Sequence, residues 1–256
     1  MDDLEKDQNE DHFEEPTLED FLSNEEDEWK KERKQKRKSW ITKLVASILS
    51  FALFVSAIQI WPQLFNLSSI SFLQKSSVLS QQEDISEYKN AVVTIQNQYS
   101  KGTGFNISKN GLIITNYHVV NNMNPITVTF PKGELLNASI IVSDPDLDLA
   151  ILQVKGEDLP FLTLSKPDEW RKQDHIYVIG NPLFHNQIVN EGKILDGSDQ
   201  NGVLMLSAPI YKGNSGSPVI SSKGDVIGVV FAKSMEDPIG YAIPIEKVLE
   251  KLPESN

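Results

Sequence analysis

A single apolar run divides this chain and limits what it can fold into. Between Trp40 and Trp61 lie twenty residues in which Lys43 is the only charge. As a helix rising about 1.5 Å per residue, they span about 30 Å, the thickness of the hydrocarbon core of a bilayer. Lys43 lies within one turn of the end, where its ammonium reaches the interface, and tryptophan is typical of both interfaces. The pattern predicts a transmembrane helix over residues 40–61.

The charges before this run predict its orientation. Residues 30–38, KKERKQKRK, hold seven bases and one acid. Basic residues beside a membrane helix favour the cytoplasmic side, so we expect the N-terminus in the cytoplasm and the remainder of the chain outside it. The alternatives are a buried soluble helix and a cleaved signal peptide, for which Val55-Ser56-Ala57 is a loose cleavage site. A long acidic leader argues against cleavage, so we expect an uncleaved single-pass anchor in a cell membrane.

The first 39 residues are predicted to be a disordered cytoplasmic tail, acidic and then basic. Residues 1–29 carry fourteen acids and one lysine, and such a segment buries too little apolar surface to offset its ordering entropy. Residues 1–38 contribute −7 of the formal net charge of −12. The remaining charge leaves no basic balance for nucleic-acid binding. Docking of a cytoplasmic partner onto the acidic tail is the functional alternative to a solvated tail.

The pattern changes after residue 88. Residues 62–88 are rich in Ser and Gln and are predicted to be a linker. Short apolar runs then alternate with Gly, Asn, Pro and Asp turns every 8–12 residues or so, which is typical of all-β barrels and sandwiches. Two sets of about six strands predict two packed barrels within residues 89–256, the first over about 89–160 and the second over about 170–245. A helical pattern over about 245–252 follows.

The composition removes several kinds of chemistry. The chain has no cysteine, which excludes disulfides, thiolate zinc sites and cysteine nucleophiles. It has few histidines, which argues against a histidine-rich metal site. The four are His12, His118, His175 and His185.

The segment Gly213-Asn214-Ser215-Gly216-Ser217-Pro218 is the first candidate for chemistry. Its two glycines allow backbone angles that are closed to other residues, so Ser215 can lie on a tight turn with its hydroxyl exposed. The backbone N–H groups of Gly213 and Ser215 can then converge on one point, as an oxyanion hole requires. An ordinary polar turn is the alternative. The apolar strands on both sides favour the functional interpretation.

His118 and Asp148 complete a candidate triad. His118 follows the apolar strand LIIT and precedes two valines, and Asp148 lies between two leucines at the start of another strand. A carboxylate in such a setting is costly unless it is paired, and pairing with the imidazole Nδ1–H satisfies it and orients the base. His175 and His185 are the competing bases, but neither has a comparable apolar setting.

Four segments taken in order now resemble a known family. GTGFNISKNGLIITNYHVV, DPDLDLAILQV, IGNP and GNSGSPVI are similar to the trypsin-like serine peptidases of the HtrA/DegP type, over about residues 91–248. The resemblance implies a chymotrypsin-like double β-barrel with its site between the barrels and no cofactor. It implies His118 as general base, Asp148 as orienting carboxylate and Ser215 as nucleophile. The oxyanion hole would be formed by the backbone of Gly213, Asn214 and Ser215.

The resemblance also implies a specificity pocket at Ile210, Phe231, Ala232 and Lys233. Pockets of this type are usually apolar and favour small aliphatic residues. Lys233 either attracts an acidic side chain of the substrate or points to solvent, and the solvated interpretation is favoured. The sequence departs from the family in Ser217, where glycine is frequent, a feature shared with glutamyl endopeptidases. We also expect no PDZ domain, because the residues after Ser215 are needed to finish the second barrel.

The implied function is that of a serine endopeptidase acting on unfolded or exported polypeptides at the outer face of a bacterial membrane. A homotrimer is a further expectation from the family, with residues 65–73 as candidate subunit contacts. The alternative is a non-catalytic or latent envelope scaffold that binds misfolded chains.

Overall fold

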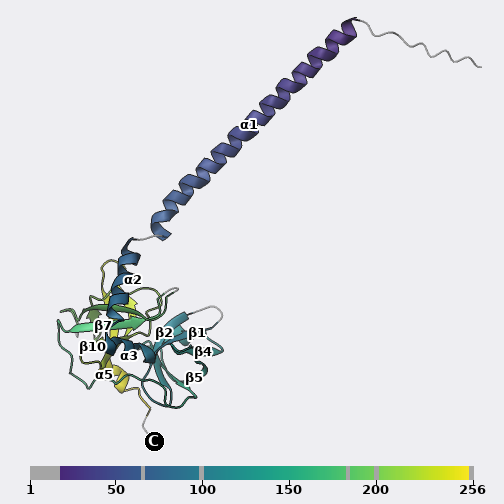
Figure 1. Ribbon diagram of the computed structural model, residues 1–256. Helices are drawn as coiled ribbons and strands as arrows, with labels where there is room; N and C mark the ends of the chain where they lie inside the picture. Colours follow the sequence, from purple (N-terminus) through teal and green to yellow (C-terminus); the bar gives the residue numbers. More distant parts are fainter. Residues whose placement is uncertain (1–17, 65–66, 98–100, 183–184, 199–201, 254–256) are drawn as a thin grey trace, which may run out of the picture. The chain divides into compact units, whose positions relative to one another are not determined.

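The computed structural model divides into two compact units, Met1–Asn66 and Leu67–Asn256, each described here by itself (Figure 1). The part described is residues 18–253, without 65–66, 98–100, 183–184 and 199–201, and without the side chains of 18–28 and 57–72. The first 17 residues of the predicted tail therefore lie outside the described residues, as do almost all side chains of the predicted trimer contact.

The first unit contains one described helix, α1 (Leu18–Leu64). The backbone is therefore helical from residue 18 to residue 39, where composition predicts a disordered tail. Lys, Arg and Glu are good helix formers, and pairs one turn apart add a few tenths of a kcal/mol. The Lys36 ammonium lies 3.0 Å from the Glu32 carboxylate, and the Arg33 guanidinium lies 4.1 Å from the centre of the Trp29 ring.

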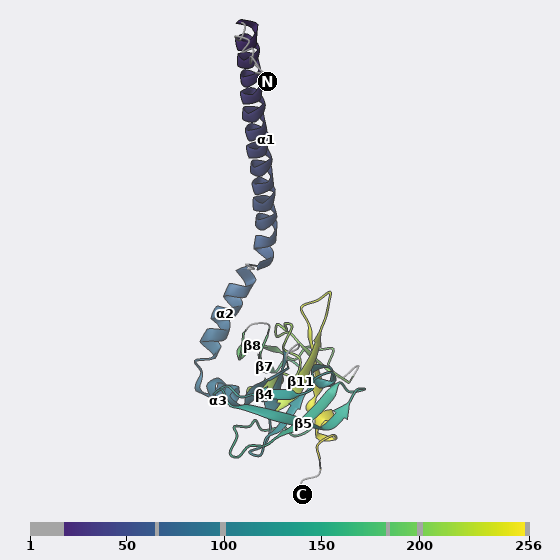
Figure 2. The ribbon, with the colours of Figure 1, turned by 90° about the vertical axis from the view of Figure 1, so that its right-hand side faces the viewer.

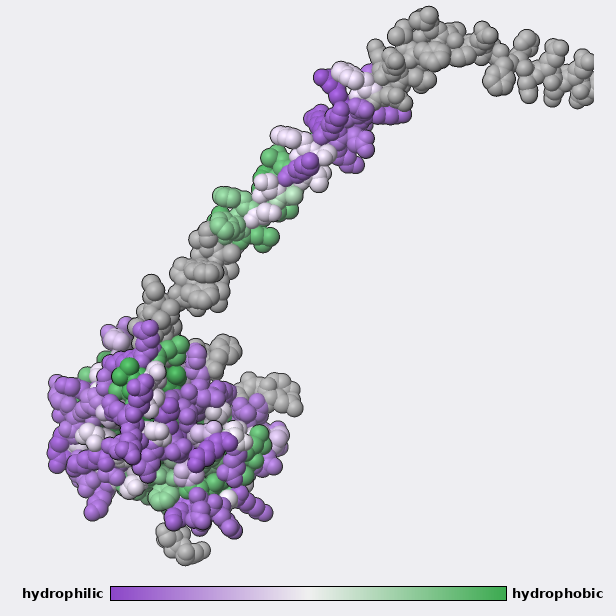
Figure 3. All heavy atoms as spheres, in the orientation of Figure 1, coloured by the Kyte–Doolittle hydropathy of each residue, from purple (hydrophilic) through white to green (hydrophobic). Residues whose placement is uncertain are grey.

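One stretch of α1, Trp29–Ser56, is long and apolar enough to cross a membrane, judged by length and composition among the described residues. Its apolar side chains are exposed, with Phe51 at 68% and Leu53 at 71% of their free surface. Figure 3 shows the hydrophilic, lysine-rich stretch of this helix followed by the hydrophobic one. An exposed apolar helix of this kind is suited to a lipid environment.

The second unit is built on two six-stranded antiparallel sheets, shown side by side in Figure 1. The first sheet closes into a barrel in the order β1-β2-β3-β6-β5-β4. Its strands are β1 (Val92–Gln96), β2 (Lys101–Asn106), β3 (Leu112–Thr115), β4 (Ile126–Thr129), β5 (Leu135–Asp144) and β6 (Leu149–Val154). A single helical turn, α4 (Tyr117–Val120), follows β3.

The second sheet has the order β8-β7-β10-β11-β12-β9, and a bridge between Ile194 and Leu206 joins its two edges. Its strands are β7 (His175–Gly180), β8 (Ile188–Lys193), β9 (Leu204–Leu206), β10 (Pro218–Ser221), β11 (Val226–Lys233) and β12 (Gly240–Pro244). The short helix α5 (Ile245–Leu249) ends this part of the chain. The predicted double β-barrel is confirmed, with the C-terminal helix shorter than predicted.

One buried cluster joins the two sheets. Phe105 and Leu149 of the first sheet belong to the same cluster as Ile179, Ile220 and Ile243 of the second. Fully burying a side chain of this kind stabilises the fold by about 1.5–3 kcal/mol. Since the cluster lies between the barrels, it holds them together and fixes the elements that meet there.

Two helices occupy the segment that the composition predicts to be a linker. They are α2 (Leu67–Leu79) and α3 (Glu83–Ala91). Leu79 and Ile85 are buried in the cluster between the sheets, so the few apolar residues of this Ser-rich segment are enough to dock it. The domain therefore begins before residue 89.

Helix α2 is tied to strand β8, against which it packs (Figure 2). The backbone N–H of Val189 donates to the hydroxyl of Ser76 at 2.9 Å, in a buried contact. The Lys75 ammonium lies 3.0 Å from Glu191, and its hydrogen bond holds the pKa of that carboxyl below its usual value. The outer edge of β8 thus finds partners on α2, as sheet edges generally require.

Ser76→Ala tests this attachment. The substitution leaves the buried N–H of Val189 without an acceptor, which costs about 1–3 kcal/mol. We expect the free energy of unfolding to fall by that amount in chemical denaturation. Ser77→Ala, at an exposed position of the same helix, is the control and should change it by less than about 0.5 kcal/mol. Equal effects of the two substitutions would contradict this role of Ser76.

Candidate active site

His118 lies on the single turn of α4, which follows β3 and packs against β2 and β6 of the first barrel. Val119 and Val120 are buried in the core of the first barrel, so the helical turn is anchored while the His118 side chain stays 48% exposed. Asn116, fully buried at the start of this turn, donates from Nδ2 to the backbone carbonyl of Asp148 at 2.9 Å. The imidazole is therefore fixed at its base and open to solvent at its tip.

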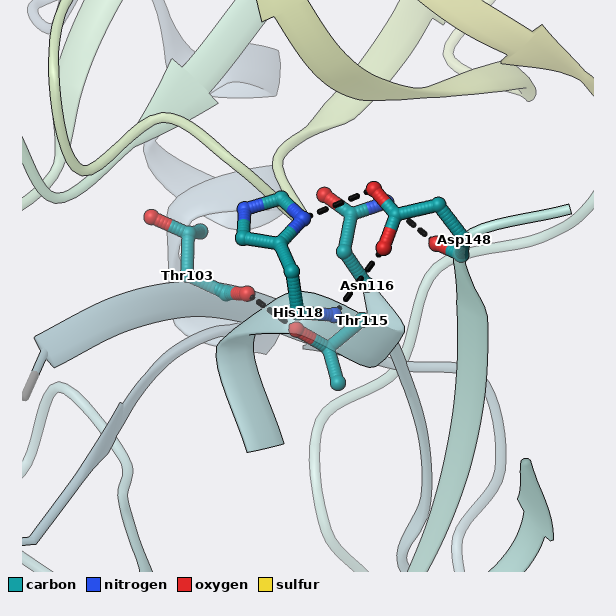
Figure 4. Close-up of polar contacts among 5 residues, drawn as sticks. All are labelled: Thr103, Thr115, Asn116, His118 and Asp148. Carbon is teal, nitrogen blue, oxygen red and sulfur yellow. Dashed lines mark hydrogen bonds and ion pairs between the residues drawn. The ribbon is translucent and has the colours of Figure 1, made fainter. Parts of the chain in front are cut away.

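Asp148 holds the imidazole directly. Its Oδ2 lies 2.7 Å from His118 Nδ1, and its Oδ1 accepts the backbone N–H of His118 at 2.9 Å. Figure 4 shows the His118 ring turned toward this carboxylate. A carboxylate only accepts hydrogen bonds, so the contact assigns the imidazole proton to Nδ1 and leaves Nε2 as a proton acceptor. Asp148 itself has a left-handed backbone with φ of 53°.

Ser215 is the second residue of the second of two consecutive tight turns. The N–H of Asn214 donates to the carbonyl of Tyr211 at 3.0 Å, and the N–H of Ser217 donates to that of Asn214 at 2.9 Å. Gly213, with φ of 101°, occupies the third position of the first turn, and Gly216, with φ of 83°, that of the second. A positive φ at this position favours glycine strongly, which explains the two glycines around the serine.

The two N–H groups that the sequence predicts as oxyanion donors are unused within the described residues. Among the described residues, the N–H groups of Gly213 and Ser215 have no hydrogen-bond acceptor, whereas the N–H of Asn214 is used by Tyr211. Asn214, the residue between the two predicted donors, therefore has no free N–H of its own. Burial raises the pKa of Tyr211, at the start of the first turn, so this phenol stays neutral.

Thr103 of β2 joins these turns to the first barrel. Its N–H donates to the carbonyl of Ser215 at 3.1 Å, and its hydroxyl donates to the carbonyl of Gly213 at 2.6 Å. The same hydroxyl accepts the N–H of Asn181 at 2.9 Å. Thr103 is fully buried, so these contacts are shielded from water and strong.

Thr115 carries this network toward the histidine. Its hydroxyl donates to the carbonyl of Thr103 at 2.7 Å, three residues before His118, as Figure 4 shows. The backbone of Gly216 fits closely on the other side, because a Cβ there would come within 2.0 Å of the Thr103 carbonyl oxygen. The contact network thus places the Ser215 turns against the strands that lead to His118. The hydrogen bonds of the described residues include none between the Ser215 hydroxyl and the imidazole.

The turns around Ser215 also contain two buried polar side chains, those of Asn214 and Ser217. The carboxamide of Asn214 and the hydroxyl of Ser217 are buried and make no hydrogen bond to another protein group among the described residues. Both adjoin Gly180, where a Cβ would come within 2.2 Å of the Ser217 hydroxyl and 2.8 Å of Asn214 Oδ1. The Ser217 side chain, present where the family often has glycine, therefore occupies the space beside Gly180 of β7.

Two of the four predicted pocket residues line a hollow that Tyr211, at the start of the first turn, also borders. Ile210 and Lys233 border a pocket of about 330 Å³, together with Asp237. Ile210 lies against Gly240, where a Cβ would come within 2.5 Å of it. Phe231 and Ala232 do not border this pocket. Phe231 instead packs against the cluster between the sheets, and Ala232 pairs with Tyr241 on β12.

The competing histidines lie elsewhere. His175 Nε2 lies 3.2 Å from Glu191 on β8, and the exposed His185 has its backbone N–H bonded to Pro182. Across the described part of the chain, no group of three or more histidine or acidic side chains is arranged to hold a metal ion.

The sequence analysis missed the buried polar residues that support the site. They are Thr103, Thr115, Asn116 and Asn181. Their signal in the sequence is weak, because a threonine or asparagine next to a glycine or in a strand is common. The motif IGNP did contain Asn181, but nothing in the sequence pointed to its partner.

Comparison with known proteins agrees with this geometry. Residues 102–229 match the family model of the trypsin-like peptidase domain. The chain is 36% identical over 166 residues to "Probable periplasmic serine endoprotease DegP-like" of Chlamydia trachomatis serovar D, covering 59% of this chain and 33% of that protein. It is 32% identical over 169 residues to "Serine protease HTRA1" of Xenopus laevis, covering 61% and 36%. The chain thus spans about a third of the length of these relatives.

Solved structures give the same result for the fold. The serine endoprotease of Yersinia pestis superposes with a TM-score of 0.62 at 28% identity, covering 65% of this chain and 63% of that one. The HtrA-type protease AlgW with a decapeptide superposes with a TM-score of 0.60 at 27% identity, covering 66% and 65%. With half of its length matched by the family model and the double barrel shared with these structures, the chain belongs to the trypsin-like peptidase family and is similar to its HtrA/DegP-type members.

Proposed function

We propose that this protein is a serine endopeptidase that uses His118, Asp148 and Ser215. The observation that carries the proposal is the 2.7 Å contact between His118 Nδ1 and Asp148 Oδ2. It leaves Nε2 available to take the proton of a serine hydroxyl, and the Thr103 network supports the turns that carry that serine.

The proposed reaction proceeds by acylation and deacylation. His118 removes the proton from Ser215, whose oxygen attacks the carbonyl carbon of the peptide. The N–H groups of Gly213 and Ser215 stabilise the resulting oxyanion. His118 then protonates the leaving amine as the C–N bond breaks, and water repeats the sequence on the ester. Asp148 holds the imidazole in place throughout and stabilises the imidazolium that forms each time His118 takes up a proton.

The proposed setting is the outer face of a bacterial membrane. The exposed apolar stretch of α1 supports an anchor within residues 40–61, and the basic residues before it favour a cytoplasmic N-terminus. Several of the similar proteins are described as periplasmic endoproteases. We propose unfolded or exported polypeptides as substrates, and a homotrimer and a cytoplasmic partner of the acidic tail as further features.

A latent peptidase is the second candidate. It is favoured by one observation, which is that no hydrogen bond among the described residues joins the Ser215 hydroxyl to His118. Such contacts often tighten only when substrate is bound. A latent enzyme would react slowly with an active-site probe until a substrate or partner is added.

Ser215→Ala separates the enzyme from a scaffold. The full chain in detergent should react with a fluorophosphonate and digest denatured casein, and the variant should do neither, since loss of a catalytic serine costs about a millionfold in rate. Its melting temperature should be unchanged, because the Ser215 hydroxyl makes no hydrogen bond among the described residues. Labelling that persists in the variant would reject Ser215 as the nucleophile. A wild-type protein that neither labels nor digests would favour the scaffold.

Thr103→Val tests the support of the oxyanion turn. The valine keeps the shape of the side chain but removes the donor to Gly213 and the acceptor for Asn181, so the turn loses its fixed orientation. We expect kcat to fall by roughly 10- to 100-fold, somewhat less than for the loss of an oxyanion donor.

Two further variants make the Thr103 test specific. Thr103→Ser keeps the hydroxyl and should retain most of the activity. Thr129→Val removes a buried hydroxyl that has no hydrogen-bond partner among the described residues of the same barrel, and it should leave kcat unchanged. An equal loss in Thr129→Val would show that any change in the first barrel disturbs catalysis, against a specific role for Thr103.

A further inference from the structure

The turn that carries Asp148 is braced by a second aspartate. Asp144 ends β5, and Leu149 opposite it begins β6, so the four residues between them form the connecting loop. Asp144 Oδ1 accepts the N–H of Leu147 at 2.9 Å, and the N–H of Asp148 donates to the carbonyl of Pro145 at 3.3 Å. The Asp144 carboxylate is therefore an internal support of the loop.

The other oxygen of Asp144 is held from the C-terminal end of the domain. Lys251 Nζ lies 2.7 Å from Asp144 Oδ2. Lys251 comes two residues after α5, whose Ile245 and Val248 are fully buried in the cluster between the barrels. Leu147, within the loop, packs against the same cluster. The ammonium group and the loop are thus positioned by one rigid core.

This ion pair is shorter and less exposed than an ordinary surface pair. The Asp144 side chain is only 17% exposed and that of Lys251 42%, whereas the pair of Lys109 and Asp158 is 3.9 Å apart with both side chains largely exposed. The hydrogen bond from Lys251 lowers the pKa of Asp144, with the N–H of Leu147 as a second cause. The bond to Asp144 raises the pKa of Lys251, and the charges of Glu250 and Asp146 act in the same direction. Both partners are therefore charged at neutral pH.

We propose that Lys251 is a positioning residue for the peptidase reaction, acting through Asp144 on the orientation of Asp148. The inference rests on the proposed function. Asp148 holds His118 through both carboxylate oxygens from a left-handed backbone position, which is retained only while its surroundings hold it. Loss of the outer tether lets the loop move, and small displacements of catalytic groups have large effects on rate.

The test compares Lys251→Met with Lys247→Met in the full chain. Lys247 belongs to α5 and donates to the carbonyl of Gly202 at 2.6 Å, so its loss removes a comparable lysine contact away from the triad. We expect Lys251→Met to lower kcat roughly three- to tenfold at unchanged KM, and Lys251→Arg to restore most of it, since Arg maintains the ion pair. Lys247→Met should leave kcat at its wild-type value.

A second readout does not depend on activity. NMR of protein labelled with 15N at histidine observes the Nδ1–H proton that His118 shares with Asp148. In Lys251→Met we expect this resonance to move upfield relative to wild type, because a displaced Asp148 makes a longer and weaker hydrogen bond, while the ring resonances of His175 and His185 stay unchanged. The pH profile of kcat/KM should change in Lys251→Met and not in Lys247→Met.

The outcomes are separable. A His118 Nδ1–H resonance that is the same in wild type, Lys251→Met and Lys247→Met overturns the proposal, as does a loss of kcat that only follows a lower melting temperature with an unchanged pH profile. If that resonance moves upfield in Lys251→Met but the wild-type protein hydrolyses no peptide, the positioning of Asp148 by Lys251 stands and the proposed function fails. If the wild type is active and the two lysine variants behave alike, the proposed function stands and this inference fails.

Discussion

The buried side chain of Thr103 joins the two halves of the site. The catalytic candidates come from separate sheets, and apolar packing between the barrels specifies only their approximate distance, because it is not directional. Hydrogen bonds supply the direction. Thr103 bonds to the carbonyls of Gly213 and Ser215 on one side and to Thr115 on the other. Since its hydroxyl and N–H donate to the serine turns while its carbonyl accepts from Thr115, one residue orients these turns relative to the strand that leads to His118.

The remaining geometry depends on left-handed backbone positions. Gly213 and Gly216 use a positive φ to reverse the chain on either side of Ser215, and Asp148 uses one to direct its carboxylate at His118. Glycine adopts this conformation at little cost, but aspartate does so only with support. The support for Asp148 comes from the backbone of its loop and from Asp144, whereas Gly216 lies against the Thr103 carbonyl in a space that a Cβ would fill. The turns around Ser215 are therefore held by close packing, whereas the orientation of Asp148 depends on its loop.

Much of this could be predicted from the sequence, and what was missed has a physical reason. Short apolar runs between turn residues predict the double barrel, and an aspartate between two leucines indicates a paired carboxylate. Thr103 could not be identified in this way. Its partner Gly213 is 110 residues away, and a threonine in a strand is common for its β propensity alone. The helices α2 and α3 were missed because a few buried residues, such as Leu79 and Ile85, dock a segment whose composition is that of a linker. The helix over residues 18–39 was missed because a composition this rich in charge is typical of disordered segments. Oppositely charged side chains one helical turn apart nevertheless stabilise a helix there.

The most direct test of the central claim is a crystal structure of the full protein after reaction with a peptidyl phosphonate. The account predicts a covalent bond between phosphorus and Ser215 Oγ. It also predicts a phosphonyl oxygen within about 3 Å of the N–H groups of Gly213 and Ser215, with the bond from Thr103 to the Gly213 carbonyl intact. An unmodified Ser215, or a Gly213 N–H turned away from the bound phosphonate, would contradict it.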